Sequence, residues 1–277
     1  MNRPRSPDDP IPLTLFLSDL HLGRGSAAES AAAEGDAVAL LRAHEAEVVA
    51  TGGALYLVGD VFDAFMEYRH LVPKGFVRLQ GLLAAWTDRG VPVTYLAGNR
   101  DPWHLDYFER ELGVRVVQEA VEEEVEGVRA YIAHGDALTA AEPLYTRLRP
   151  LLRSPFMARL YRMSLPGDAA FAFARRVGRT VSSGGAVNPA VADDLRAHAA
   201  RILSETDAGL VVLGHGHRAE CTPMPGGTYL NPGYWFADRR YGRLDAGVPT
   251  LRRWPEAVAE AEPPAPPGVH DAAPPLR

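Results

Sequence analysis

Five short apolar runs, each followed within a few positions by a polar residue, constrain the fold of this chain more than any other feature. The runs occupy residues 13–17, 55–58, 91–97, 128–133 and 210–213. Each is continuous rather than alternating, which is typical of strands buried on both faces of a sheet. Helical patterns alternate with these runs, so we expect a layered α/β or α+β sheet fold.

Three segments between the runs carry helical signals, and one carries a hairpin signal. The stretch 27–49 is alanine-rich, and 76–86 places large apolar residues at helical spacing. Asparagine and proline at 188–189 are typical of an N-cap and the first helical position, so a third helix is expected to begin there. Glu-Gly at 126–127 separates two strand-like segments and predicts a β-hairpin.

The length and the two ends limit the domain organisation. A chain of 277 residues, 47% of them hydrophobic, can bury a large core in one domain. Residues 1–10 and 256–277 are rich in proline with little to bury, so we expect disordered ends around a folded part at 11–255. We find neither a signal-peptide pattern nor the roughly twenty apolar residues that span a bilayer, and expect a cytoplasmic protein.

Cysteine content and charge exclude other classes of protein. The single cysteine, Cys221, can form neither a disulfide framework nor a cysteine-rich metal site. The formal charge of −6 argues against a protein that coats nucleic acid. We therefore expect no nucleic-acid partner, and the sequence implies no protein partner.

Side chains that can bind metal ions cluster directly after the apolar runs. They are Asp19, His21, Asp60, Asn99, His134, His215 and His217. Because loops at strand ends converge on one edge of an α/β sheet, we expect these side chains to lie together. Seven donors exceed what one tetrahedral ion needs, and this oxygen and imidazole set suits Mn²⁺, Fe²⁺ or Zn²⁺. Asp60 is the best candidate to bridge two ions about 3.5–4 Å apart, as in two-metal phosphoester hydrolysis.

Each of these residues has a simpler interpretation when taken alone. An isolated aspartate is more often a capping residue, and an isolated histidine is more often a satisfied core side chain. The ordered set behind five strand-like runs favours the metal interpretation, because chance assembly of all seven is improbable.

Five motifs resemble those of the calcineurin-like metallophosphoesterases. They are Asp19-Leu20-His21, Gly59-Asp60-Val61-Phe62-Asp63, Gly98-Asn99-Arg100-Asp101, His134-Gly135-Asp136 and Gly214-His215-Gly216-His217. The resemblance, which extends over most of the chain, implies a four-layer α/β/β/α sandwich and a metal-activated water as nucleophile. It implies two divalent ions, Mn²⁺ first among the candidates. The implied ligands are Asp19, His21, Asp60 and His217 for one ion, and Asp60, Asn99, His134 and His215 for the other.

Arg100 stands where many members of the superfamily have a histidine. Arginine is no practical general acid, because its pKa exceeds about 12, but its guanidinium can hold two phosphate oxygens. The substitution therefore favours a leaving group that needs little protonation, such as one phosphate of a diphosphate. The motif resembles that of the UDP-2,3-diacylglucosamine diphosphatases, which release lipid X and UMP from a lipid-linked nucleotide sugar. An arginine that only pairs with Asp101 or Asp106 is the alternative.

The stretch 140–182 differs from the rest of the chain in charge. It holds eight arginines against one glutamate and one aspartate, a net charge of +6. The arginines are interleaved with apolar residues, a combination that suits helices meeting anionic, acylated or membrane-surface partners. We expect a helical cap insertion at about 140–187 that overhangs the metal site. A solvated helical hairpin packed on the core is the alternative.

In the diacylglucosamine diphosphatases a helical cap occupies this place, and acyl chains lie between cap and core. The residues that the resemblance and the motifs assign to substrate binding are Asn99, Arg100, Tyr145, Arg179, Ser182 and His215. Those assigned to catalysis are Asp60, Asn99, Arg100 and His215. Residues 183–186 lack the polar side chains expected shortly after the cap motif, so the headgroup and acyl preference stay open.

Three hypotheses about function follow. The first is a two-metal hydrolase that cleaves the diphosphate of UDP-2,3-diacylglucosamine or a close relative and docks on the inner face of the inner membrane. The second is a general metallophosphoesterase for soluble nucleotides or phosphoproteins. The third, a non-enzymatic scaffold with an idle site, is disfavoured by the complete ligand set.

Overall fold

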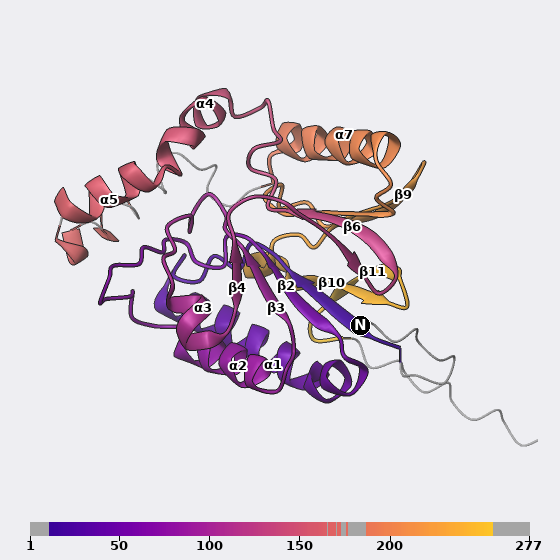
Figure 1. Ribbon diagram of the computed structural model, residues 1–277, viewed down its shortest axis with the longest axis horizontal. Helices are drawn as coiled ribbons and strands as arrows, with labels where there is room; N and C mark the ends of the chain where they lie inside the picture. Colours follow the sequence, from indigo (N-terminus) through magenta and orange to yellow (C-terminus); the bar gives the residue numbers. More distant parts are fainter. Residues whose placement is uncertain (1–10, 165, 170, 173–175, 177–186, 257–277) are drawn as a thin grey trace, which may run out of the picture.

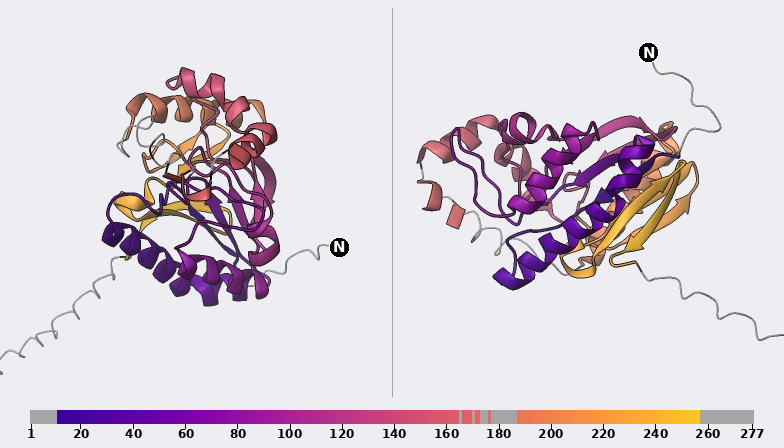
Figure 2. Two further views of the ribbon diagram at one scale, coloured as in Figure 1. Left: turned by 90° about the vertical axis from the view of Figure 1, so that its left-hand side faces the viewer. Right: turned by 90° about the horizontal axis from the view of Figure 1, so that it is seen from below.

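Two β-sheets face each other at the centre of the protein, and helices cover their outer sides (Figures 1 and 2). The computed structural model describes residues 11–256 apart from 165, 170, 173–175 and 177–186. Its layers follow the α/β/β/α order, so the expected fold class is confirmed. Among the described helices, none combines the length and the hydropathy needed to cross a membrane.

The first sheet has six strands in the order β11-β10-β1-β2-β3-β4. Their bounds are Val248–Arg253, Arg240–Asp245, Leu13–Leu17, Ala54–Val58, Val93–Leu96 and Arg115–Val117. Strands β1 to β4 run parallel, whereas β10 and β11 join as an antiparallel hairpin beside β1. The parallel strands are connected through helices α1 (Ala27–Thr51), α2 (Val77–Asp88) and α3 (Tyr107–Leu112).

The second sheet has five strands in the order β5-β6-β7-β9-β8. Their bounds are Val121–Val125, Val128–Ala133, Leu210–Leu213, Gly227–Asn231 and Glu220–Met224. Strands β6, β7 and β9 run parallel, with β5 and β8 antiparallel at the edges. Helix α7 (Pro189–Glu205) covers its outer face, and the short helix α8 (Trp235–Asp238) precedes β10.

The layering explains why the apolar runs are continuous. In β1, Leu15 and Leu17 pack in the core beneath α1 and α2, while Phe16 packs in the core between the sheets. In β7, Val212 faces the layer between the sheets and Val211 faces α7. Because the central strands bury both faces, alternate residues enter different cores and nearly all of them are apolar.

The local signals predicted the ends of several elements. Asn188 caps α7, since its Oδ1 accepts a hydrogen bond from the Ala190 N–H at 3.1 Å. The turn at Glu126 and Gly127 has positive φ at both residues, as a two-residue hairpin of type I′ requires. The three predicted helices and the hairpin are thus confirmed.

Two helices with complete bounds follow β6 in the described part of the predicted cap. They are α4 (Pro143–Leu152) and α5 (Pro155–Ser164), which extend away from the sandwich at one end (Figure 1). Trp103 Nε1 donates to the Leu152 carbonyl at 2.8 Å, which ties the end of α4 to the body. Much of 165–186 lies outside the described residues, and the boundaries 140–187 and 11–255 stay predictions.

Candidate metal centre

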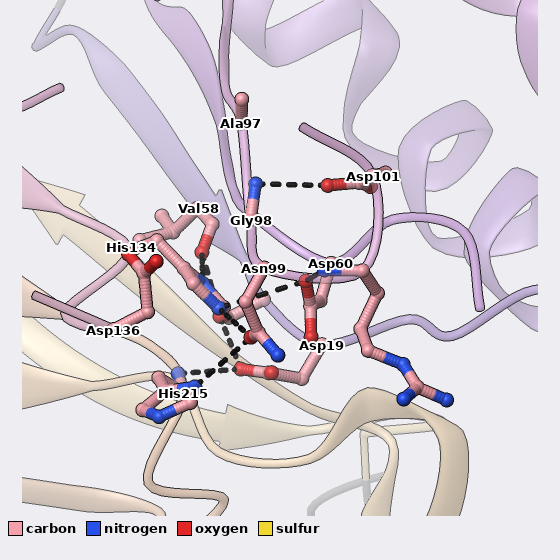
Figure 3. Close-up of polar contacts among 12 residues, drawn as sticks. Asp19, Val58, Asp60, Ala97, Gly98, Asn99, Asp101, His134, Asp136 and His215 are labelled. Atoms are coloured by element: carbon pink, nitrogen blue, oxygen red, sulfur yellow. Dashed lines mark hydrogen bonds and ion pairs between the residues drawn. The ribbon is translucent and has the colours of Figure 1, made fainter. Parts of the chain in front are cut away.

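The seven predicted ligands lie together where loops from both sheets meet. Figure 3 shows five of them: Asp19, Asp60, Asn99, His134 and His215. Four of the seven come from the first sheet: Asp19 and His21 follow β1, Asp60 follows β2, and Asn99 follows β3. The other three come from the second sheet: His134 follows β6, and His215 and His217 follow β7. The site therefore lies between the sheets rather than at the edge of one, and most of its side chains are buried.

The backbone at these positions is unusual for residues with a side chain. Positive φ angles between 42° and 60° occur at Asp19, His21, Asp60, His215 and His217. A non-glycine residue there costs of order 1–3 kcal/mol and persists only where the surroundings hold it. Five such residues among the seven expected ligands indicate loops shaped for a function rather than for stability.

Two motif glycines are required by close approach. A Cβ at Gly98 would lie 2.0 Å from Asp60 Oδ1, and a Cβ at Gly59 would lie 2.3 Å from His134 Nδ1. Both distances are far inside van der Waals contact, so a side chain at either position would displace an expected ligand. The glycines before Asp60 and Asn99 thus allow three loops to converge.

One group of ligand atoms gathers around His21. Its Nε2 lies 3.3 Å from His217 Nε2, 3.6 Å from Asp19 Oδ1 and 3.6 Å from Asp60 Oδ2. His217 Nε2 lies 3.2 Å from Asp19 Oδ1. Atoms that each bind one ion at about 2.1 Å lie roughly 3–3.5 Å apart, so the atoms of Asp19, His21 and His217 suit a common ion, with Asp60 Oδ2 beside His21. We refer to these four atoms as the first ligand group.

A second ligand group gathers around Asn99. Its Oδ1 lies 3.1 Å from both His134 Nε2 and His215 Nδ1. Asp60 Oδ1 lies 3.6 Å from His134 Nε2, while the other Asp60 oxygen belongs to the first group. Asp60 is therefore placed to bridge two ions. Asp19 also borders this second group, within 4.8 Å of Asp60 and His134.

The hydrogen bonds behind His134 and His215 engage one nitrogen of each ring and leave the other nitrogen facing Asn99. His134 Nδ1 donates to the Val58 carbonyl at 2.9 Å, and His215 Nε2 donates to Glu142 Oε2 at 3.0 Å. With those protons engaged, a neutral ring in either place turns a lone pair toward Asn99 Oδ1, which is itself an acceptor. A cation among the three atoms would satisfy all of them.

The electrostatics of the cluster agree with cation binding. Burial, helped by the carboxylates of Asp101 and Asp19 and opposed by His21, raises the pKa of Asp60 to about 7. Burial would likewise raise the pKa of Asp19, but the nearby imidazoles of His217 and His21 hold it well below its usual range. Asp19 Oδ1 is buried with no hydrogen-bond partner in the described structure. These residues fit divalent cations.

Glu142 is a site residue that the sequence reasoning missed. It immediately precedes α4, and its carboxylate binds His215 from the side opposite Asn99. Burial opposes protonation of His215, but the hydrogen bond and charge of Glu142 raise the pKa of that ring to about 9. The only signal in the sequence is an acidic residue within a stretch of arginines.

Arg100 lies beside the site, but its partner differs from both that were considered. Its Nη2 donates to Asp63 Oδ1 at 2.9 Å, and its backbone N–H donates to Asp60 Oδ1 at 2.8 Å. Asp101 instead accepts from Gly98 N at 2.8 Å and from the Tyr95 hydroxyl, which stabilises the loop itself. The suggested pairing of Arg100 with Asp101 or Asp106 is therefore wrong.

The cap residues are only partly described. The Tyr145 hydroxyl donates to Asp136 Oδ2 at 2.6 Å. Asp136 is two residues after His134 in the sequence, so Tyr145 contacts the loop that carries this expected ligand. Asp136 also accepts from Arg149 and Arg153 at 3.0 Å each, so two of the predicted cap arginines anchor α4. Arg179 and Ser182 lie outside the described residues, and their roles stay predictions.

The two-sheet fold and the motifs at its strand ends resemble those of the metallophosphoesterases, as the sequence predicted. No family model matches the chain. The chain is similar to curated proteins named UDP-2,3-diacylglucosamine hydrolase, which confirms the narrower resemblance. Identity to the Porphyromonas gingivalis protein is 37% over 149 residues, covering 53% of this chain and 55% of that protein.

Other relatives of the same name extend over more of the chain. The Nitrosococcus oceani protein is 32% identical over 168 residues, covering 60% of this chain and 62% of that protein. The Ralstonia nicotianae protein is 28% identical over 250 residues, covering 85% of this chain and 90% of that protein. The chain thus spans less than two thirds of the length of the first two relatives and most of the third.

Solved structures of similar arrangement are more distant. A phosphoesterase from E. coli is 17% identical with a TM-score of 0.40, covering 87% of this chain and 92% of its own. Vacuolar Protein Sorting 29 from Cryptosporidium parvum is 14% identical with a TM-score of 0.42, covering 88% of this chain and 96% of its own. Likeness at this level carries no inference about function.

Proposed function

We propose that this protein hydrolyses the diphosphate of UDP-2,3-diacylglucosamine, or of a close relative, to lipid X and UMP. The observation that carries the proposal is the buried Arg100 guanidinium, fixed by Asp63 beside two ligand groups that share Asp60. The relatives named UDP-2,3-diacylglucosamine hydrolase support this substrate.

The roles of the residues follow from their positions. Bound divalent ions, with Mn²⁺ as our first choice, would polarise a phosphoryl oxygen of the α-phosphate and lower the pKa of an attacking water. Asp60 would contribute one oxygen to each ion. Asn99, His134 and His215 would supply the other ligands of the second ion. Asn99 and Arg100 would also hold phosphate oxygens.

Arg100 would act through charge and hydrogen bonds rather than through proton transfer. A sugar phosphate leaves as a stable anion, so the reaction needs no general acid at this position. A guanidinium binds two phosphate oxygens in a fixed plane, which suits a diphosphate better than a single ester oxygen.

The test is Mn²⁺-dependent release of UMP from UDP-2,3-diacylglucosamine, with UDP-N-acetylglucosamine and bis-p-nitrophenyl phosphate assayed beside it. We expect strong preference for the acylated nucleotide sugar. Robust turnover of the two soluble compounds with none of the acylated one would overturn the proposal and favour a general metallophosphoesterase.

We further propose that α4 and α5 dock on an anionic membrane surface, at the inner face of the inner membrane. Each helix exposes an apolar stripe at spacing i, i+4, i+7. The stripes are Leu144, Leu148 and Leu151 in α4 and Phe156, Leu160 and Met163 in α5, all between 41% and 74% exposed. Exposed Arg147 and Arg159 lie in the same helices, a combination suited to anionic lipid.

Vesicle co-sedimentation tests the membrane proposal. Vesicles with phosphatidylglycerol should retain the protein, and Phe156→Ser with Met163→Ser should release it. Val248→Ser is the matched control, because Val248 is 61% exposed on β11 in the body of the protein. Equal loss in the control and the double variant would contradict docking through these helices.

A further inference from the structure

We infer that Arg24 is a positioning residue for the first ligand group and sets the affinity of the ion bound there. The inference rests on the proposed metal centre, and it assigns a task to a residue outside all five motifs. Arg24 lies three positions after His21, before α1 begins, and its side chain is only 14% exposed.

The first contact of Arg24 reaches His21 through Asp63. Arg24 Nε donates to Asp63 Oδ1 at 2.8 Å, and the same oxygen lies 3.6 Å from His21 Nδ1. A carboxylate beside Nδ1 orients the ring and leaves Nε2 toward the ion position. Arg24, together with Arg100, which donates to the same Asp63 oxygen at 2.9 Å, thereby holds the carboxylate that lies beside His21.

The second contact reaches His217 through Tyr234. Arg24 Nη1 donates to the Tyr234 hydroxyl at 3.0 Å. The Tyr234 ring stacks on His217, with centroids 4.3 Å apart and planes 4° from parallel, and meets His21 edge-on at 5.4 Å. Tyr234 therefore limits the rotation of both imidazoles, and Arg24 limits the movement of Tyr234.

The two contacts converge on the first ligand group alone. His21 and His217 belong to that group, whereas His134 and His215 of the second are oriented by the Val58 carbonyl and Glu142. The histidines of the two ligand groups thus have separate supports in the described structure. Loss of such an outer contact typically costs 10–100-fold in metal affinity, so we expect an effect confined to one of two ions.

The experiment is Mn²⁺ titration of the metal-free full-length protein by calorimetry. We expect Arg24→Ala to weaken the binding of one of two Mn²⁺ ions about 10–100-fold and to leave the affinity for the other unchanged. The Mn²⁺ affinity of Arg24→Lys should lie between those of the wild type and Arg24→Ala, because one ammonium group cannot contact both Asp63 and Tyr234. Arg243→Ala is the matched control, since Arg243 is similarly shielded at 19% exposure and pairs with Asp245 on β10.

A second background identifies which ion is affected. In His217→Ala, which damages the first group, Arg24→Ala should cause little further loss, whereas in Asn99→Ala its full effect should remain. Equal weakening of both ions would overturn the inference. So would unchanged Mn²⁺ affinity with a raised KM, because Arg24 would then contact substrate. Wild-type protein that binds two ions but releases no UMP would overturn the proposed substrate and leave this inference standing.

Discussion

At the residue scale, the site depends on positions where the backbone and the side chain are both constrained. Asp19, Asp60 and His215 occupy left-handed conformations while they carry the expected ligand atoms. The motif spacings predicted these residues from sequence, because each follows a buried strand. The partner of Arg100 and the contact between Glu142 and His215 could not be predicted, since both depend on how separate loops pack.

Gly98 provides a steric test of the centre. We expect Gly98→Ala to reduce activity at least about 100-fold, because the new methyl group would displace Asp60 from both ligand groups. Gly81→Ala in α2 is the control, since its Cβ meets nothing within 4 Å, and it should be neutral or stabilising. UMP release and thermal unfolding of both variants give the comparison. Full activity in Gly98→Ala would contradict the geometry.

Glu142 provides a test of the second ligand group. Glu142→Ala should weaken one Mn²⁺ ion about tenfold or more, because His215 would lose the acceptor that orients it. Glu142→Gln keeps an acceptor oxygen and should recover much of that affinity. Calorimetric titration of both variants measures the difference, and identical affinities in Ala and Gln would exclude an orienting role.

At the element scale, the apolar runs located the central strands within one or two residues. They could not show that β1 to β3 and β6 with β7 belong to different sheets, because a strand buried on both faces looks the same in either. Strands β4, β8, β9, β10 and β11 were not predicted, and all five mix exposed or partly buried positions with polar residues. Helix ends with a cap, such as Asn188, were predictable.

Asp136 joins α4 to the body and so decides whether the cap stays attached. We expect Asp136→Ala to destabilise the protein by about 3 kcal/mol, because Arg153 would be left shielded without this carboxylate. Asp193→Ala, at an exposed pair with Arg218, should cost less than about 1 kcal/mol. Urea unfolding measures both. Similar losses in the two variants would argue against an anchoring role for Asp136.

At the scale of the whole molecule, ion binding and stability should be linked. Burying Asp19, Asp60, His21 and His134 without cations opposes folding, so chelation should lower the melting temperature. Each ion supplied at 100 times its dissociation constant should add about 2.7 kcal/mol. Scanning calorimetry with Mn²⁺ or a chelator tests this, and Asp60→Asn should reduce the shift. A melting temperature that is the same with Mn²⁺ and with a chelator would contradict the metal centre.

The position of the centre between the sheets has a consequence for folding. Both ligand groups draw atoms from loops of the first and the second sheet, and Asp60 belongs to both groups. Neither half of the chain alone contains a complete group. High-affinity ion uptake would therefore begin only after the two sheets have docked, and the time course of Mn²⁺ capture during refolding would mark that last step of assembly.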